Sequence, residues 1–432
     1  MVRHIRTAAL YGLGVLLFQL GSGGLTIKAQ DLQASPISRY GLGVLSNTSP
    51  TAYRGMGGVG IALADPKHPN FLNPAAYAAT DSLSFLMDIA GSVNWGRYSD
   101  SQTHKNTFLG GLDYVALQFP LWRDKVALSA GIIPFSTAGY NSQRTVALKD
   151  DTFTTIQQFS GTGSLQTVYA GIGTKIYGGL TLGVNLSYLF GKITHSVTNS
   201  PNTSVGTTER TVSALRVNNL LLDLGTQYKF TVKKNQVVTV GAVFSPSLKL
   251  TPKQTISTER NYGTVSQPEI TSERTQLALK SPMQIGGGVS WEGYNKLLVS
   301  ADVKVKRWEE TYNPFKPDNV TLHTSYLTAL GIQYRNDPYS RDYADKIYYR
   351  GGLNYNTGYL SVGSLGRVDR VGLSLGLGLP VTAIDDRTSY IDLALEYSKA
   401  YAPKSKLLNE DYLRLTVSLN FNETWFRKLL IY

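Results

Sequence analysis

Two short patterns in the chain resemble sites that bind nucleotides or cleave esters. Residues 55–60 read Gly-Met-Gly-Gly-Val-Gly, a G-x-G-x-x-G pattern that holds a dinucleotide phosphate when a strand precedes it and a helix follows it. The residues before it are turn-rich here, and Pro66, Pro69 and Pro74 follow it. Proline interrupts helices, so we do not predict a nucleotide site, and these glycines need another explanation.

Residues 372–376 read Gly-Leu-Ser-Leu-Gly, which matches the G-x-S-x-G pattern of serine hydrolases. They lie within an alternating strand pattern, whereas that nucleophile needs a strand-to-helix turn. The histidines are dispersed without metal-ligand spacing, and the chain has no cysteine. We therefore expect no enzyme activity, no metal and no cofactor. A hydrolase with serine and histidine on adjacent strands is the alternative.

The composition favours strands and turns. Among 432 residues there are 42 glycines and 27 tyrosines, and 17% of the residues are charged. The formal net charge of +12 comes from single basic residues scattered along the chain, not from a patch. This distribution argues against a nucleic-acid partner and favours an anionic lipid surface.

Residues 1–30 have the layout of an export signal. Basic residues precede the apolar run 7–20, which is too short to span a bilayer as a helix. We expect this signal peptide to be cleaved near Ala29 to Asp31. A retained N-terminal anchor is the alternative.

Much of the remaining chain alternates apolar and polar residues with a period of two. In residues 413–421, for example, the odd positions are leucine, valine or phenylalanine and the even positions are polar or charged. A membrane barrel needs this pattern in segments of about ten residues, because one face contacts lipid and the other contacts water. A soluble sandwich also alternates, but it covers its apolar face with a second sheet.

We therefore predict an all-β protein, a transmembrane antiparallel β-barrel of about 14 strands over residues 81–432. The strands are expected near 82–95, 111–120, 125–134, 164–177, 179–195, 214–230, 236–249, 276–291, 296–309, 323–336, 346–357, 370–380, 388–398 and 411–422. Short turns should close the periplasmic rim. Long polar loops are expected at the other rim, near 135–163, 196–213, 250–275 and 310–322.

Residues 31–80 show no alternation and are too long for a plain linker. They are rich in glycine, proline, asparagine and alanine, and they precede the first expected strand. We expect this segment to fold into the barrel as an N-terminal hatch, or plug.

The chain resembles the FadL-type outer-membrane transporters of long-chain fatty acids and other hydrophobic compounds. The stretch SRYGLGVLSNTSPTAYRGMGGVGIALADPKHPNFLNPAAY is similar to the hatch of that family, including an Asn-Pro-Ala signature at Asn73, Pro74 and Ala75. SPMQIGGGVSWEGYNKLLVSADVKVKRW resembles its central hairpin. YYRGGLNYNTGYLSVG and RVDRVGLSLGLGL resemble a pair of strands near its C-terminus.

This resemblance implies a monomeric channel among outer-membrane lipids that takes up a hydrophobic small molecule, such as a long-chain fatty acid, past a hatch that acts as a gate. The gate residues would be Asn73 to Ala75, with Gly55, Gly57, Gly58 and Gly60. A static contact between plug and wall is the alternative role of Asn73 to Ala75. These glycines would let the hatch backbone turn tightly in a crowded lumen, which answers the question raised by the G-x-G-x-x-G pattern.

Strand parity points several charged side chains into the lumen. The basic candidates for contact with a ligand carboxylate are Arg350, Arg414 and Lys304. Their alternative role is to pair with inward acidic residues or to hold the hatch. Some FadL-like barrels are accessory subunits of type IX protein secretion, so a role as an accessory barrel of a secretion or surface-assembly complex, with an outer-membrane protein partner, is the alternative function.

Overall fold

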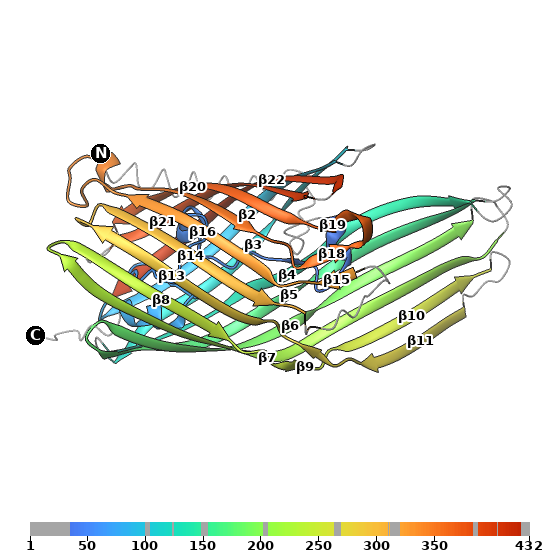
Figure 1. The fold of residues 1–432 in the computed structure, drawn as a ribbon, viewed down its shortest axis with the longest axis horizontal. Coiled ribbons are helices and arrows are strands. Elements are labelled where there is room, and N and C mark those ends of the chain that lie inside the picture. The colour runs from blue at the N-terminus through green and yellow to red at the C-terminus, as the bar shows by residue number, and fades with distance from the viewer. Residues whose placement is uncertain are drawn as a thin grey trace, which may run out of the picture.

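The structure is a computed structural model that describes residues 35–99, 104–122, 125–147, 154–201, 206–262, 269–309, 311, 320–382, 388–403 and 405–424. One sheet contains 17 strands, and all of them except β1, β10 and β11 form a closed antiparallel barrel in which the first strand, β2, pairs with the last, β22 (Figure 1). The barrel therefore has about 14 strands, as predicted. No helix in the described ranges is long and apolar enough to cross a membrane.

The barrel strands are β2 (Ser84–Ser99), β3 (His104–Trp122), β4 (Val126–Ala147), β5 (Thr154–Tyr177), β6 (Leu180–Pro201), β7 (Thr208–Lys233), β8 (Gln236–Ser245), β13 (Met283–Gly293), β14 (Leu297–Arg307), β16 (Ser325–Tyr334), β17 (Tyr348–Asn356), β20 (Asp369–Thr382), β21 (Thr388–Ala402) and β22 (Ser405–Thr424). Each overlaps one predicted segment. Predicted apolar positions face outward, as the half-exposed side chains of Leu373 and Leu375 show. The expected signal peptide lies outside the described residues.

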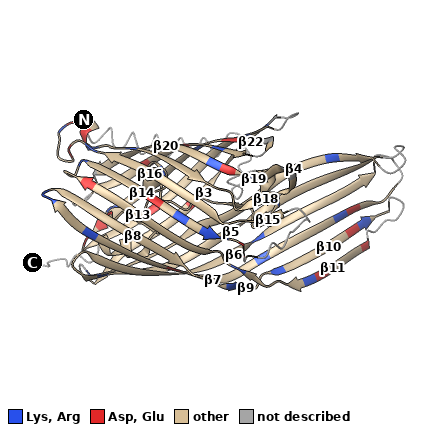
Figure 2. Ribbon diagram, viewed as in Figure 1, with Lys and Arg blue, Asp and Glu red and all other residues tan. Residues whose placement is uncertain are grey.

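The described residues of two of the expected long loops, near 135–163 and 196–213, lie mostly in strands, and those near 250–275 form a hairpin, so these loop predictions are wrong. Strands β4 to β7 continue past the barrel, and β7 pairs there with β10 (Lys253–Asn261), which pairs with β11 (Glu269–Gln276). We call these outer strand halves and the β10–β11 hairpin the wing; they project beyond the rest of the barrel (Figure 1). Beyond its base the wing carries mainly polar residues on both faces, and β10 and β11 carry charges of both signs (Figure 2). Without an apolar face, such strands lack the pattern that identifies barrel strands.

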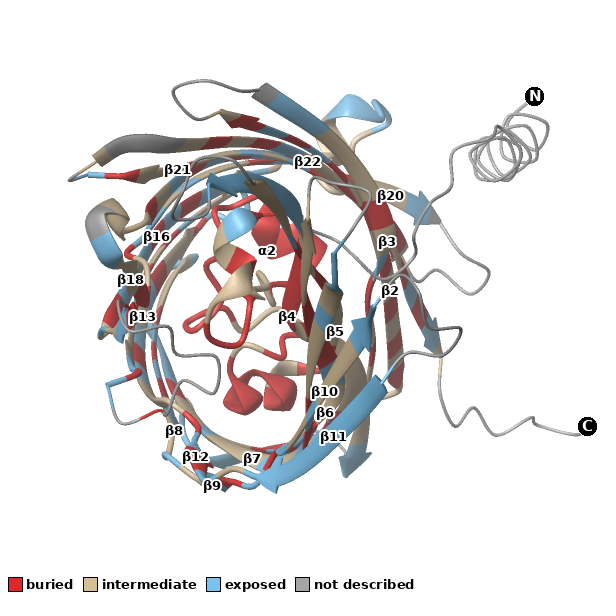
Figure 3. Cartoon of the chain, turned by 90° about the vertical axis from the view of Figure 1, so that its right-hand side faces the viewer, coloured by how far each residue is buried: buried red, intermediate tan, exposed pale blue. Residues whose placement is uncertain are grey.

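The hatch lies inside the barrel, where most of it is buried (Figure 3). It comprises η1 (Pro36–Arg39), β1 (Val44–Leu45), α2 (Thr51–Arg54) and η2 (Pro74–Ala79). Strand β1 pairs with β4, which ties the start of the hatch to the base of the wing. The predicted plugged barrel is therefore confirmed as the fold.

A small sheet, which we call the lid, lies at the rim opposite the short turns. It consists of β15 (Val320–Leu322), β18 (Leu360–Val362) and β19 (Gly366–Arg367). The short helix η4 (Gly363–Leu365) connects β18 to β19. Val320 and Leu360 of the lid pack in one buried cluster with Leu42 of the hatch and Ile193 and Leu215 of the barrel wall. The remaining short elements are β9 (Lys249–Leu250), β12 (Leu279–Lys280) and η3 (Ala344–Lys346).

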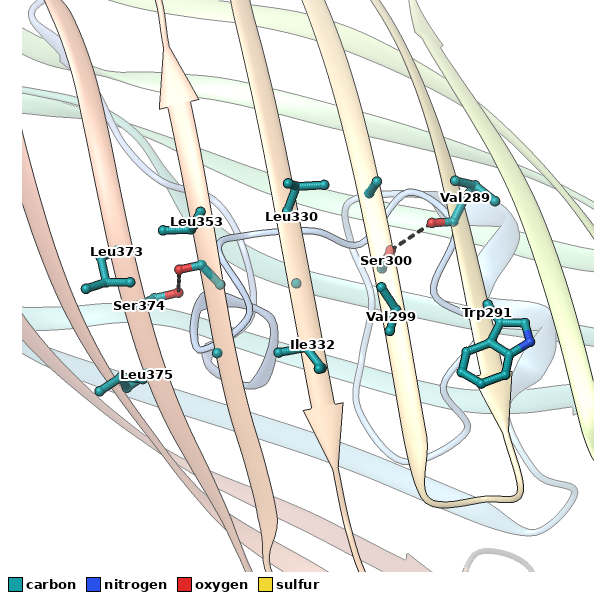
Figure 4. Close-up of a pocket in the computed structure, with 14 residues that line it drawn as sticks. Val289, Trp291, Val299, Ser300, Leu330, Ile332, Leu353, Leu373, Ser374 and Leu375 are labelled. Carbon is teal, nitrogen blue, oxygen red and sulfur yellow. Dashed lines mark hydrogen bonds between the residues drawn. The ribbon is translucent and has the colours of Figure 1, made fainter.

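The outer wall carries a shallow apolar groove of about 580 Å³ that crosses β13, β14, β16, β17 and β20 (Figure 4). Its sides are aliphatic residues such as Leu330, Leu353 and Leu375. Its floor includes Gly351 and Gly352, so the wall has little side-chain thickness here. The inner face of the same wall region receives the hatch.

We expect Gly352→Val to prevent the hatch from seating and Gly351→Val to be tolerated. A Cβ at Gly352 would overlap the backbone of Met56 and Gly57, whereas a Cβ at Gly351 would have only the Ile332 side chain as a neighbour, at 3.6 Å. Overpacking of this kind costs about 1–3 kcal/mol. Hydrogen exchange of the hatch amides in detergent checks this, and equal exchange in both variants would contradict it.

Candidate functional site

The glycine run at 55–60 shapes the part of the hatch that follows α2. Gly57 and Gly58 have φ angles of 75° and 85°, which a residue with a side chain rarely adopts. Gly55 approaches the wall so closely that a Cβ there would lie 2.8 Å from the Gly376 Cα. The run therefore provides a tight turn and close contact with the wall.

The same run binds a carboxylate of the barrel itself. Asp302 on β14 accepts hydrogen bonds from the backbone N–H groups of Gly60 and Ile61, at 2.7 and 2.9 Å. Asp302 is 3% exposed, and these amides supply two donors to its Oδ2. A pattern that resembles a phosphate site thus joins the hatch to the wall.

Arg54 anchors the opposite side of the hatch. Its Nη1 lies 2.5 Å from Asp113 Oδ2 on β3, and both side chains are 1% exposed. The remaining guanidinium donors reach the carbonyl oxygens of Ser49 and Asn47, each at 2.8 Å. A buried ion pair needs such additional hydrogen bonds to repay the loss of hydration. We call the Arg54–Asp113 pair the anchor.

Asn73 holds the end of the hatch through its amide group. Its Oδ1 accepts from the N–H of Ala75 at 3.1 Å and caps η2, where Pro74 takes the first helical position. Its Nδ2 donates to the carbonyl oxygens of Ile61, at 2.7 Å, and of Thr226 in the wall, at 3.1 Å. These contacts show how the predicted gate residues are held; whether they move stays a prediction.

His68 joins the hatch to β21. Its Nδ1 lies 2.7 Å from Asp65 Oδ2, its Nε2 lies 3.0 Å from Asp392 Oδ2, and the ring is 1% exposed. Asp392 also pairs with Arg350 of β17. Burial alone would lower the pKa of His68, but Asp392 and Asp65 outweigh it and raise this pKa to about 10. His68 is therefore positively charged at neutral pH.

A cavity of about 380 Å³ lies between the hatch and the lid. Its wall contains Lys304, Lys306, Arg370 and Arg414, none of which forms a hydrogen bond or ion pair with another described residue, although Arg370 lies over the ring of Tyr412 at 5.3 Å. Its three carboxylates are each hydrogen-bonded to neutral donors. The pairs are Asp223 with Ser245, Glu396 with Asn47, and Glu410 with Ser35 and Tyr412. The cavity therefore presents cations whose hydrogen-bonding capacity is not used within the described chain.

The structure separates the three predicted ligand contacts. Lys304 and Arg414 line the cavity, as parity placed them. Arg350 is buried instead in the ion pair with Asp392, and its Nε donates to Gln333 at 2.7 Å. Arg350 thus takes the alternative role of pairing with an inward acidic residue. Within the described residues, no group of three histidine, aspartate or glutamate side chains is placed to hold a metal ion.

Sequence reasoning missed two residues of this site. His68 seemed to be one of several dispersed histidines, and its partner Asp392 lies 324 positions away. Arg54 lies 59 positions from Asp113. The available signal was an ionisable residue in a segment expected to fill a lumen, where a charge needs a partner.

We expect Arg54→Gln or Asp113→Asn alone to destabilise the protein strongly, by about 3–5 kcal/mol, because each leaves one buried charge unpaired. The double variant should lose less free energy of unfolding than the two single variants together, since it leaves no unpaired charge buried. Urea unfolding in detergent measures this. As a control, Arg260→Gln breaks an exposed pair with Glu209 and should change stability little. Additive losses would contradict the prediction.

Comparisons with known proteins agree with this architecture. The Pseudomonas putida toluene transporter TodX has 12% identity and a TM-score of 0.58, covering 88% of this chain and 100% of that one. The CymD monoaromatic hydrocarbon channel has 14% identity and a TM-score of 0.56, covering 88% and 98%. A Pseudomonas aeruginosa FadL homologue has 13% identity and a TM-score of 0.54, covering 88% of this chain and 99% of that one.

At these identities the structural likeness establishes the fold. No curated protein matches the sequence. The sequence model of the BamG family matches residues 14–431, which is nearly the whole chain. The chain therefore belongs to the BamG family and has the plugged-barrel fold of the FadL-type proteins.

Proposed function

We propose that this protein is an outer-membrane channel that takes up hydrophobic or amphipathic small molecules, such as long-chain fatty acids, past its hatch. The observation that carries the proposal is the cavity between hatch and lid. Its volume falls within the range of small-molecule sites. The names of the similar structures, a toluene transporter and a monoaromatic hydrocarbon channel, support passage of such compounds.

The lining of the cavity favours a ligand with a polar end. Apolar side chains such as Phe135, Leu221 and Leu360 lie beside Lys304 and Arg414. A carboxylate can accept bidentate hydrogen bonds from a guanidinium, and the carboxylates of the cavity leave Arg414 unpaired. A fatty acid would satisfy both parts of this lining. Passage then requires the hatch or the lid to move, because both bound the cavity.

We expect Arg414→Gln to weaken binding of labelled laurate about 10- to 100-fold, since a hydrogen bond to a charged group contributes about 1.5–3 kcal/mol. The measurements are laurate binding to the purified barrel and laurate uptake by cells that carry each variant. Arg260→Gln, on the exposed wing, is the matched control and should behave like the wild type.

The uptake of labelled compounds by cells that lack the protein tests the proposed transport function. If these cells take up labelled laurate and toluene at the parental rate, the proposed transport function is wrong. Loss of laurate uptake with normal toluene uptake would restrict the channel to amphipathic anions.

The wing supports a second candidate function, an accessory barrel in a secretion or surface-assembly complex. Strand β11 pairs only with β10, and the outer part of β4, residues 140–147, pairs only with β5 among the described strands. Open strand edges are sites where another chain can add a strand, and an isolated polar sheet gains little stability from its own faces. A partner on the wing would supply the missing contacts.

This second function predicts stable co-purification with other outer-membrane proteins after gentle extraction. Native mass spectrometry of the extract reads bound proteins and bound lipids together. Deletion of residues 253–276, which form the β10–β11 hairpin and its connection, should release the partners while the barrel still folds. A barrel that always runs alone would exclude this function.

A further inference from the structure

We propose that His68, together with Asp65, Asp392 and Arg350, is a releasable latch that closes the short-turn end of the hatch, whereas the Arg54–Asp113 anchor stays fixed. The proposal rests on the proposed channel function for its purpose, but its geometry stands by itself. Within the described residues these two groups contain the buried ion pairs that join hatch to wall. They differ in how each could be opened.

The latch needs a charged imidazole ring. Both ring nitrogens face carboxylate oxygens, at 2.7 and 3.0 Å, so both must carry a proton to donate. With Arg350, the group contains two cations and two carboxylates, which balance each other. A neutral ring could satisfy only one of the two carboxylates, and the hatch–wall bond would weaken.

The latch lies where the hatch meets solvent. Residues 64–67 are partly exposed, while the hatch residues on either side of them, such as Leu63 and Asn70, are buried. Asp392 and Arg350 lie near the starts of β21 and β17, at the rim of the short turns. The exposed residues therefore form the surface of the hatch at that rim.

The partners of the latch can be separated at lower cost than those of the anchor. The side chain of Asp65 is 26% exposed, so water can hydrate it once the ring withdraws, and Asp392 keeps Arg350 as a partner. Asp113 and Arg54 are each 1% exposed and would be left without water. The latch can therefore open while the anchor remains closed.

The chain around the latch suits movement as a unit. Pro66 and Pro69 flank Lys67 and His68, and their fixed φ angles restrict the backbone on both sides. Lys67 donates to the hydroxyl of Tyr390 at 3.2 Å and lies near the ring of Tyr348. These contacts belong to the same rim and would break together with the latch.

The test compares His68→Gln, which removes the charge, with His68→Lys, which keeps it. In planar bilayers the full-length wild type and His68→Lys should stay mostly closed, and His68→Gln should open at least tenfold more often. Hydrogen exchange should show faster exchange over residues 61–72 in His68→Gln, with residues 51–58 unchanged. His323→Gln alters an exposed histidine bonded to Thr321 and is the matched control.

Unchanged conductance and exchange in His68→Gln would overturn the latch, and so would faster exchange across the whole hatch, since His68 would then be a general packing contact. If His68→Gln does not fold, Asp65→Asn decides, because it removes only the partly exposed carboxylate. Faster exchange over residues 61–72 in Asp65→Asn would support the latch, and unchanged exchange would overturn it. If His68→Gln opens the latch but the protein transports no laurate or toluene, the latch stands and only the proposed channel function is wrong.

Discussion

The close contact between the hatch backbone and the barrel wall is the constraint on which the structure depends. Where the hatch backbone lies directly against the wall, the inward position of the wall has no room for a side chain. The wall accordingly has glycine where the hatch passes, as at Gly376 beside Gly55, Gly331 beside Met56, and Gly225 beside Asn73. The high glycine content of the chain is thus partly a requirement of the plug.

The hatch also has buried apolar contacts with the wall, such as Phe71 against Tyr114 and Tyr169. Where backbones touch without side chains, however, little apolar surface is available, and there hydrogen bonds and charges orient the hatch. Asp302, Asp113 and Asp392 supply these from three strands around the lumen, β14, β3 and β21. Each carboxylate is buried and meets donors from the hatch, which fixes the plug in one register.

The sequence predicted the barrel well because lipid and water on opposite faces impose a period of two that can be read directly. It failed for the wing, whose faces both contact water, so residues 253–276 carry no apolar alternation. Parity placed Arg350, Arg414 and Lys304 inward. It could not show that Arg350 would be taken by Asp392, or that His68 would bind a strand 324 positions away, because only tertiary structure brings such residues together.

The glycines beneath the apolar groove of the outer wall affect how the wall transmits force. Gly331 and Gly352 face Met56 of the hatch, and Gly351 faces outward beside them. Little more than the backbone of the wall therefore separates the outer surface from Met56 at this point. The bending stiffness of that patch comes from the ladder of backbone hydrogen bonds. Changes in lateral pressure within the bilayer would therefore reach the plug there through the backbone of the wall.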